Sequence, residues 1–292
     1  MPERRHALPV VAAGACALGL VVIGWLALDV PAVPDRDVAI LHGFTGLDRP
    51  SVSRGLEVIG RAVDPLPYAL AGLACIAVAI ARRRAWRALA VGTVLVATGL
   101  TAQALKHVFA EQRFAAWLGR GQIDAASWPS GHATAVMTLA LCAVMVAPPT
   151  WRGLTALLCG ACAIAVAYAT LGLAWHYPSD VLAGFLLAGL WVSLAVAVLQ
   201  RVEPDVAESQ GAVSWETLVV LGAIGALVAV ALVGAASGGI AQYAGERTTL
   251  VASALTIAAL ALGLVTSIVV SESAVAAWPS AGKRGTNAHG RV

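Results

Sequence analysis

Charged side chains are scarce in this sequence of 292 residues. Asp, Glu, Lys and Arg make up 12% of it, whereas hydrophobic residues make up 59%. A soluble domain carries about 25% charged residues. The shortage of charge therefore excludes an ordinary soluble domain and predicts an all-α, polytopic membrane bundle. The net charge of +3 is too small to indicate a nucleic-acid partner.

Cysteines and metal-binding patterns are also few. The five cysteines lie in apolar stretches, and the pattern Cys159-Gly160-Ala161-Cys162 has no second pair. Such cysteines are typical of small packing residues, so no disulfide framework or redox site is indicated. The sequence near the polar motifs below shows no carboxylate cluster and no His/Cys set with metal-ligand spacing. We therefore expect neither a metal nor another cofactor.

Apolar stretches long enough to approach the roughly 20 residues of a membrane helix recur along the chain. The first is expected to be a retained helix rather than a cleaved signal peptide. Eight spans are predicted, at residues 8–28, 66–81, 88–106, 131–147, 153–173, 178–199, 215–235 and 248–270.

These spans predict a division of the chain into three parts. Residues 1–199 form a six-helix core, and its segment 29–65 has apolar residues at helical spacing that favour one or two short helices on the membrane surface. Residues 200–270 add two further membrane helices. Residues 271–292 form a polar tail that we expect to be disordered and cytoplasmic.

Arginine distribution predicts the orientation. The densest basic cluster, residues 82–87, lies between the second and third spans, on the same side as both termini. The positive-inside rule makes that side cytoplasmic. The opposite side also carries several cations, so the bias is moderate. The polar motifs described next then face the outside, where the third and fifth spans end and the fourth and sixth begin.

His176 and Asp180 form the first of these motifs. They are four residues apart, and Pro178 suits the first turn of a helix. Both side chains then lie on one helix face, where Asp180 can accept a hydrogen bond from one imidazole nitrogen and leave the other free as a nucleophile. A histidine at the membrane interface beside a helix-terminal carboxylate is the simpler interpretation of the pair alone.

Pro129-Ser130-Gly131-His132 is the second motif. Ser130 is a plausible N-cap for the fourth span, and a helix N-terminus containing Gly131 presents N–H groups to an anion. His132 would lie at the mouth of that anion site and could protonate a leaving alkoxide. An ordinary capped membrane helix is the alternative.

Lys106 and Arg113 supply cations at the end of the third span. A cation at a membrane edge is a functional candidate, although snorkelling to the interface also explains it. Phosphate needs more than one positive charge around its oxygens. Taken together, the three motifs supply charge neutralisation, an anion cradle, an acid and an oriented nucleophile, which are the needs of phosphoryl transfer.

The three motifs resemble those of the type 2 phosphatidic acid phosphatase superfamily, which also includes vanadium haloperoxidases. The family patterns are K-x6-R-P, P-S-G-H and S-R-x5-H-x3-D. Here Phe114 replaces the proline of the first, the second is intact, and Ala169-Thr170 replaces the Ser-Arg pair of the third.

The resemblance implies a metal-independent phosphatase with a phosphohistidine intermediate. His176 would attack phosphorus, Asp180 would orient it, and His132 would protonate the leaving oxygen. Phosphate would be held by the side chains of the remaining motif residues and the backbone at Gly131: Lys106, Arg113, Ser130 and Thr170. Arg120 is a further hypothetical cation that would compensate for the missing arginine.

The expected substrate is a lipid phosphate, either a polyprenyl (pyro)phosphate or a glycerolipid phosphate, in contact with membrane lipids. An outward-facing site favours a lipid carrier of a bacterial cell envelope. Two alternatives stay open. One alternative to a phosphatase is a weakened family member that binds or translocates lipid phosphates, as Thr170 and Phe114 indicate. The other is a phosphotransferase that uses an alcohol in place of water.

Overall fold

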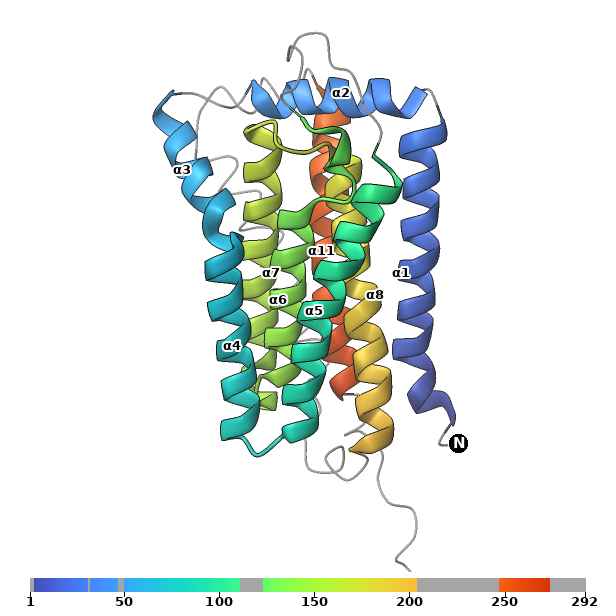
Figure 1. Ribbon diagram of the computed structural model, residues 1–292, viewed down its shortest axis with the longest axis vertical. Helices are drawn as coiled ribbons and strands as arrows, with labels where there is room; N and C mark the ends of the chain where they lie inside the picture. Colours follow the sequence, from blue (N-terminus) through green and yellow to red (C-terminus); the bar gives the residue numbers. More distant parts are fainter. Residues whose placement is uncertain (1–2, 31, 47–49, 111–122, 204–246, 274–292) are drawn as a thin grey trace, which may run out of the picture.

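Long α-helices form a bundle in this computed structural model, which describes residues 3–30, 32–46, 50–110, 123–203 and 247–273 (Figure 1). The described residues contain no strand, which confirms the all-α fold class. The elements are α1 (Glu3–Asp29), α2 (Ala32–Thr45), α3 (Pro50–Gly60), η1 (Arg61–Val63), α4 (Pro65–Ala81), α5 (Ala85–Val108), η3 (Ala125–Ser127), α6 (Gly131–Val146), α7 (Pro149–Gly172), α8 (Pro178–Val202) and α11 (Thr248–Ser273).

Six of these helices are long and apolar enough to cross a membrane: α1, α5, α6 extended by η3, α7, α8 and α11. They correspond to six of the eight predicted spans, so the prediction of a polytopic membrane bundle is confirmed. The predicted seventh span, 215–235, lies outside the described residues, as does most of the predicted tail.

The second predicted span is more complicated than a single straight helix. Val52–Val63 and Pro65–Ala81 pass the criterion for a span together, across a bend of 52°. Pro65 causes the break, because a residue that precedes proline is disfavoured in the helical region, and Asp64 is extended with ψ of 161°. The structure therefore continues α3 into α4 across this bend, whereas the sequence analysis treated residues 29–65 and 66–81 separately.

Helix α2 lies across the ends of the bundle helices, as expected for a surface helix (Figure 1). We call this end of the bundle the upper end. The opposite, lower end holds the Arg82–Arg84 turn between α4 and α5 and the start of α1. Helices α5 and α7 finish at the upper end, and α6 and α8 begin there.

Helices α6 and α8 form the centre of the bundle. In their apolar windows 72% and 67% of residues are buried, against 22% in α1 and α5. Helix α1 packs mainly on α8 and presents Val11, Leu18 and Val21 outward, as suits a helix facing lipid. Other helices surround the starts of α6 and α8 on several sides. This packing holds the side chains at these two helix starts in place.

A buried cluster of charges ties α11 to the core at the lower end. Arg87 lies 2.8 Å from Glu272 of α11 and 3.3 Å from Glu203, and Arg152 lies 3.5 Å from Glu272. Arg87 also donates to the Met145 carbonyl at the end of α6. Buried charges are tolerated when each is paired and hydrogen-bonded, as these are. The basic cluster that indicated the cytoplasmic side is thus partly neutralised within the fold.

Candidate functional site

The starts of α6 and α8 are joined directly at the upper end. The Ser130 N–H donates to the Asp180 carbonyl at 2.9 Å. Gly184 allows this approach, because a Cβ at that position would lie 2.8 Å from the Ser130 carbonyl oxygen and 2.9 Å from the Thr134 nitrogen. Real Cβ atoms do not come so close to backbone, so the absence of a side chain at Gly184 brings the second and third motifs together.

Asp180 is held in place by the first turn of α8. Its side chain is fully buried, and its Oδ2 accepts a hydrogen bond from the Tyr177 N–H at 3.0 Å. The same oxygen lies 3.6 Å from His176 Nδ1. The predicted helix start at Pro178 is present, and Asp180 lies beside His176, but His176 precedes the helix instead of lying on one of its faces. Asp180 faces Nδ1, so Nε2 is the nitrogen of His176 left for chemistry.

His132 lies beside His176 at the start of α6. Their ring centroids are 5.9 Å apart at an interplanar angle of 60°, and the Trp175 ring lies 5.2 Å from His132. Ser130 caps α6, since its Oγ accepts a hydrogen bond from the Ala133 N–H at 3.2 Å. The cap directs the first turn of α6, and His132 with it, toward His176.

Lys106 brings a positive charge to the same place from the end of α5. A Cβ built on Gly131 would lie 3.7 Å from Lys106 Nζ, so the ammonium group lies next to the helix N-terminus. The N-terminal N–H groups of a helix carry partial positive charge and favour anions. An ammonium, a helix N-terminus and two imidazoles that adjoin one another are suited to binding a phosphate and transferring it.

Of the predicted phosphate ligands, one lies outside the described residues and another bonds within its own helix. Arg113 lies outside the described residues, as does the hypothetical substitute Arg120. Thr170 is fully buried, and its hydroxyl donates to the Ala167 carbonyl of its own helix at 2.8 Å. A threonine in a helix readily bonds back to a preceding carbonyl in this way. The role of Thr170 as a phosphate ligand stays a prediction.

Sequence reasoning missed two neighbours of His132. Asp64, from the break between η1 and α4, places Oδ1 3.5 Å from His132 Nε2. Trp175 packs beside the same imidazole. The bundle brings Asp64 to His132 from far along the sequence, and no spacing rule links them. The Asp64-Pro65 pair at the start of a predicted span was the available signal, since acidic residues gather at helix starts.

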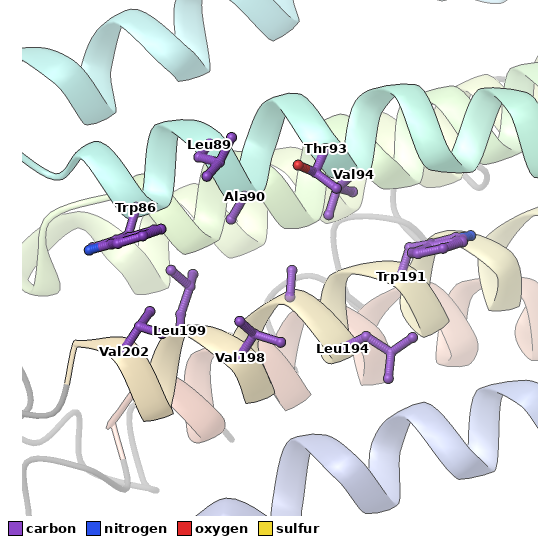
Figure 2. Close-up of a pocket in the computed structure, with 11 residues that line it drawn as sticks. Trp86, Leu89, Ala90, Thr93, Val94, Trp191, Leu194, Val198, Leu199 and Val202 are labelled. Carbon is purple, nitrogen blue, oxygen red and sulfur yellow. The ribbon is translucent and has the colours of Figure 1, made fainter.

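An apolar groove of about 260 Å³ lies between α5 and α8 (Figure 2). Trp86 and Trp191 lie at opposite ends of it, and the Trp191 ring N–H donates to Thr101 Oγ1 at 3.2 Å. Trp191 follows Asp180 by eleven residues, or about 16 Å along α8. The groove is lined by Trp86, Leu89, Ala90, Thr93, Val94, Trp191, Leu194, Ala195, Val198, Leu199 and Val202. This lining suits a hydrocarbon chain and not a phosphate.

The fold and this site define a class: a multi-pass α-helical membrane protein with paired histidines, a carboxylate and a cation at one end of its bundle. Residues 87–204 match the family model of the PAP2 superfamily, which is the type 2 phosphatidic acid phosphatase superfamily. This match supports membership of the superfamily. The match runs from α5 to the end of α8 and includes every predicted site residue, whereas α1 to α4 and α11 lie outside it.

No curated protein and no solved structure is significantly similar to the chain. The match to the superfamily, together with helices able to span a membrane, supports a membrane phosphatase in general terms.

Proposed function

We propose that the protein is a metal-independent lipid phosphate phosphatase that works through a phosphohistidine intermediate. The observation that carries the proposal is the placement of His176, Asp180 and His132 around one point at the upper end, with Lys106 beside the start of α6. Nucleophile, orienting carboxylate, acid and cation each come from a different helix end or turn, and the membrane helices deliver them to one place.

In the proposed first step, Nε2 of His176 attacks phosphorus while the bond from phosphorus to the lipid oxygen breaks. The electron pair of that bond goes to the lipid oxygen, which takes a proton from His132 and leaves as the alcohol. Asp180 stabilises the positive charge that develops on His176. Lys106, Ser130 and the Gly131 backbone, with Arg113 as a further predicted ligand, hold the phosphate oxygens.

In the second step a water molecule attacks the phosphohistidine. His132 takes a proton from this water, the bond from phosphorus to Nε2 breaks, and the electron pair returns to the imidazole. Inorganic phosphate leaves and His176 is restored. With a lipid diphosphate the leaving group is the lipid monophosphate, and His132 gives and takes a proton in the same two steps.

The substrate proposed is a polyprenyl or glycerolipid phosphate. The groove between α5 and α8 supports a lipid over a soluble phosphate ester, because these two helices also carry Lys106 and Asp180 and the groove is open to hydrocarbon. We further propose that the upper end faces the cell exterior and that both termini are cytoplasmic. The arginines at residues 82–87 support this orientation through the positive-inside rule.

Phosphate release by the purified protein tests the proposal. The protein in detergent, with a chelator present, is assayed on polyprenyl monophosphate and diphosphate, phosphatidic acid and phosphatidylglycerol phosphate. We expect release from at least one of these lipids, loss of release in His176→Ala, and inhibition by vanadate, which mimics the pentacoordinate transition state. The matched control His42→Ala, on an exposed position of α2, should keep its activity. Absence of release from the whole panel would contradict the proposal.

A second candidate function is binding or translocation of lipid phosphates without turnover. Thr170 favours it, because its hydroxyl is used within α7 and supplies no cation where the family pattern has arginine. This candidate predicts saturable binding of a lipid phosphate, unchanged in His176→Ala, with no phosphate released. A third outcome, transfer of phosphate to an added alcohol in the same assay, would indicate a phosphotransferase.

A further inference from the structure

The carboxylate of Asp64 lies against the imidazole of His132. Asp64 Oδ1 and His132 Nε2 are 3.5 Å apart, and the two side chains are 44% and 28% exposed. The residues come from different elements, the η1–α4 break and the first turn of α6. The contact between Asp64 and His132 therefore does not follow from local sequence. It exists because the packing of the bundle places the η1–α4 break next to the start of α6.

The Asp64 carboxylate makes no hydrogen bond to the start of its own helix, α4. Asp64 occupies the N-cap position of α4, where aspartate normally accepts a hydrogen bond from the first turn, but it makes no such side-chain cap bond. Pro65, the next residue, has no N–H to donate. The nearby cation Arg61 lies beside Glu57, at 4.0 Å. The carboxylate of Asp64 is thus turned to His132 instead of the groups that usually engage it.

A second contact, through the ring of Trp175, links the turn that carries Asp64 to His132. A Cβ on Gly60 would lie 2.8 Å from the Trp175 ring, so the glycine lets the turn pack closely against that ring. Trp175 in turn lies 5.2 Å from His132. Packing through Trp175 and the charge contact through Asp64 fix the turn and the imidazole relative to each other.

We infer that Asp64 is a positioning residue for His132 in the proposed phosphatase reaction, on which this inference rests. Asp64 holds the Nε2–H of His132 and selects the tautomer in which Nε2 keeps its proton. Nδ1 is then the nitrogen that gives its proton to the leaving lipid oxygen as the bond from phosphorus to that oxygen breaks. In the second step Nδ1 recovers a proton from the attacking water. His132 and His176 would each have a dedicated carboxylate, on opposite ring nitrogens.

A leaving-group comparison distinguishes this role from a purely structural one. A lipid monophosphate loses a basic alkoxide that needs a proton, whereas p-nitrophenyl phosphate loses a weakly basic phenoxide that does not. We expect Asp64→Asn to lower kcat/KM on the lipid roughly ten- to a hundredfold, below the 10²–10⁴-fold value of a general acid, and to change kcat/KM on p-nitrophenyl phosphate less than about twofold. This ratio reports the steps up to departure of the leaving group and not the later hydrolysis of the phosphohistidine, which both substrates share. The control Glu57→Gln removes an exposed carboxylate from the same segment and should change neither rate.

A double-mutant cycle and nitrogen NMR complete the test. In a His132→Ala background, Asp64→Asn should have no further effect on the lipid reaction, because both residues act through one proton. In protein carrying ¹⁵N-labelled histidine, the ring nitrogens of His132 should report the Nε2–H tautomer, and Asp64→Asn should shift them.

The outcomes separate this inference from the function on which it rests. Inactivity of the wild-type protein on every substrate would overturn the phosphatase and the catalytic part of the inference together. An active enzyme in which Asp64→Asn lowers kcat/KM equally on both substrates, or adds its full effect to His132→Ala, would overturn the inference alone. Unchanged His132 nitrogen resonances in Asp64→Asn would overturn it whether or not the protein is active.

Discussion

Asp180 makes two contacts that bear on the chemistry of His176. The same carboxylate oxygen accepts the Tyr177 N–H and faces His176 Nδ1. Replacement by asparagine keeps the size of the side chain and removes its charge. We expect Asp180→Asn to lower kcat by about 10²-fold or more, because the positive charge that forms on His176 loses its partner and the ring its orientation, with little change in KM.

The unfolding temperature in detergent serves as the control for Asp180→Asn, since a fully buried residue is being changed. It should fall by no more than a few degrees. Phosphate release gives kcat and KM on the preferred lipid. A raised KM with an unchanged kcat would show that Asp180 serves substrate binding instead, and would contradict the role proposed for it.

The site was predictable from the sequence where its members are neighbours along the chain. His176 directly precedes α8 and Asp180 lies in its first turn, while Ser130 caps α6 and His132 lies in its first turn, so the helix starts predicted from the sequence bring each pair together. Asp64 could not be found in this way, because its contact with His132 depends on how two remote elements pack. The bond of the Thr170 hydroxyl to the Ala167 carbonyl could not be predicted either, because the sequence does not show which acceptor a hydroxyl uses.

At the scale of elements, the contact between α6 and α8 depends on Gly184. A methyl group there would meet the Ser130 carbonyl oxygen and the Thr134 nitrogen, and backbone atoms at two helix starts cannot move aside independently. We expect Gly184→Ala to cost about 1–3 kcal/mol of stability, as overpacking does, and to lower activity by separating His132 from His176. Thermal unfolding and phosphate release measure the two effects.

Gly99→Ala is the matched control for this change. Gly99 lies in α5 and has open space where its Cβ would be. Alanine there should be neutral or slightly stabilising, because it is the better helix former. Equal behaviour of the two variants would show that the close approach at Gly184 does not matter to the site.

The groove between α5 and α8 gives a second test at this scale. Ala195 lines it, and Ala195→Leu would fill part of the space proposed for a lipid chain. We expect KM for a long-chain lipid phosphate to rise several-fold, since each CH₂ kept from burial forfeits about 0.8 kcal/mol. The kinetics of a short-chain soluble phosphate should not change. Ala165→Leu, on an exposed position of α7, is the control. An unchanged KM for the long-chain lipid would place its chain elsewhere.

The longer the apolar run of a helix, the better the sequence predicted the position of that helix. The long spans were located from hydropathy because the bilayer requires a continuous apolar run. The joining of α3 to α4 was not, because the polar residues near Asp64 interrupt that run and only the packing of the bundle shows that the two helices continue one another. The 3-10 turn η3, which lengthens the short α6 span to 22 residues, was likewise missed.

At the scale of the whole molecule, the lower-end charge cluster joins α11 to the part that matches the superfamily. Glu272 of α11 serves both Arg87 and Arg152. Glu272→Gln leaves two buried guanidinium groups with less negative charge, and removal of one partner from a buried pair costs about 3–5 kcal/mol. We expect a clear fall in unfolding temperature, but an unchanged kcat for the folded protein at low temperature, because the site lies at the other end.

Glu57→Gln is the comparison for that experiment, because it breaks an exposed ion pair that contributes about 1 kcal/mol or less. Its unfolding temperature should match that of the wild type within about a degree. A similarly small effect of Glu272→Gln would mean that α11 is held by apolar packing alone. Loss of kcat in correctly folded Glu272→Gln would instead show that the lower end communicates with the site.

Exposed positions at the two ends of the bundle allow the orientation of the protein in the membrane to be tested. Arg36 on α2 is exposed at the upper end, and Arg83 is exposed in the turn at the lower end. If the upper end faces outward, a thiol reagent that cannot cross the membrane should label Arg36→Cys in intact cells and Arg83→Cys after lysis alone. The wild-type protein measures the labelling of the five native cysteines. The reverse pattern would place the site in the cytoplasm and exclude a lipid of the outer leaflet as its substrate. It would also show that the arginines paired with Glu203 and Glu272 do not determine the orientation.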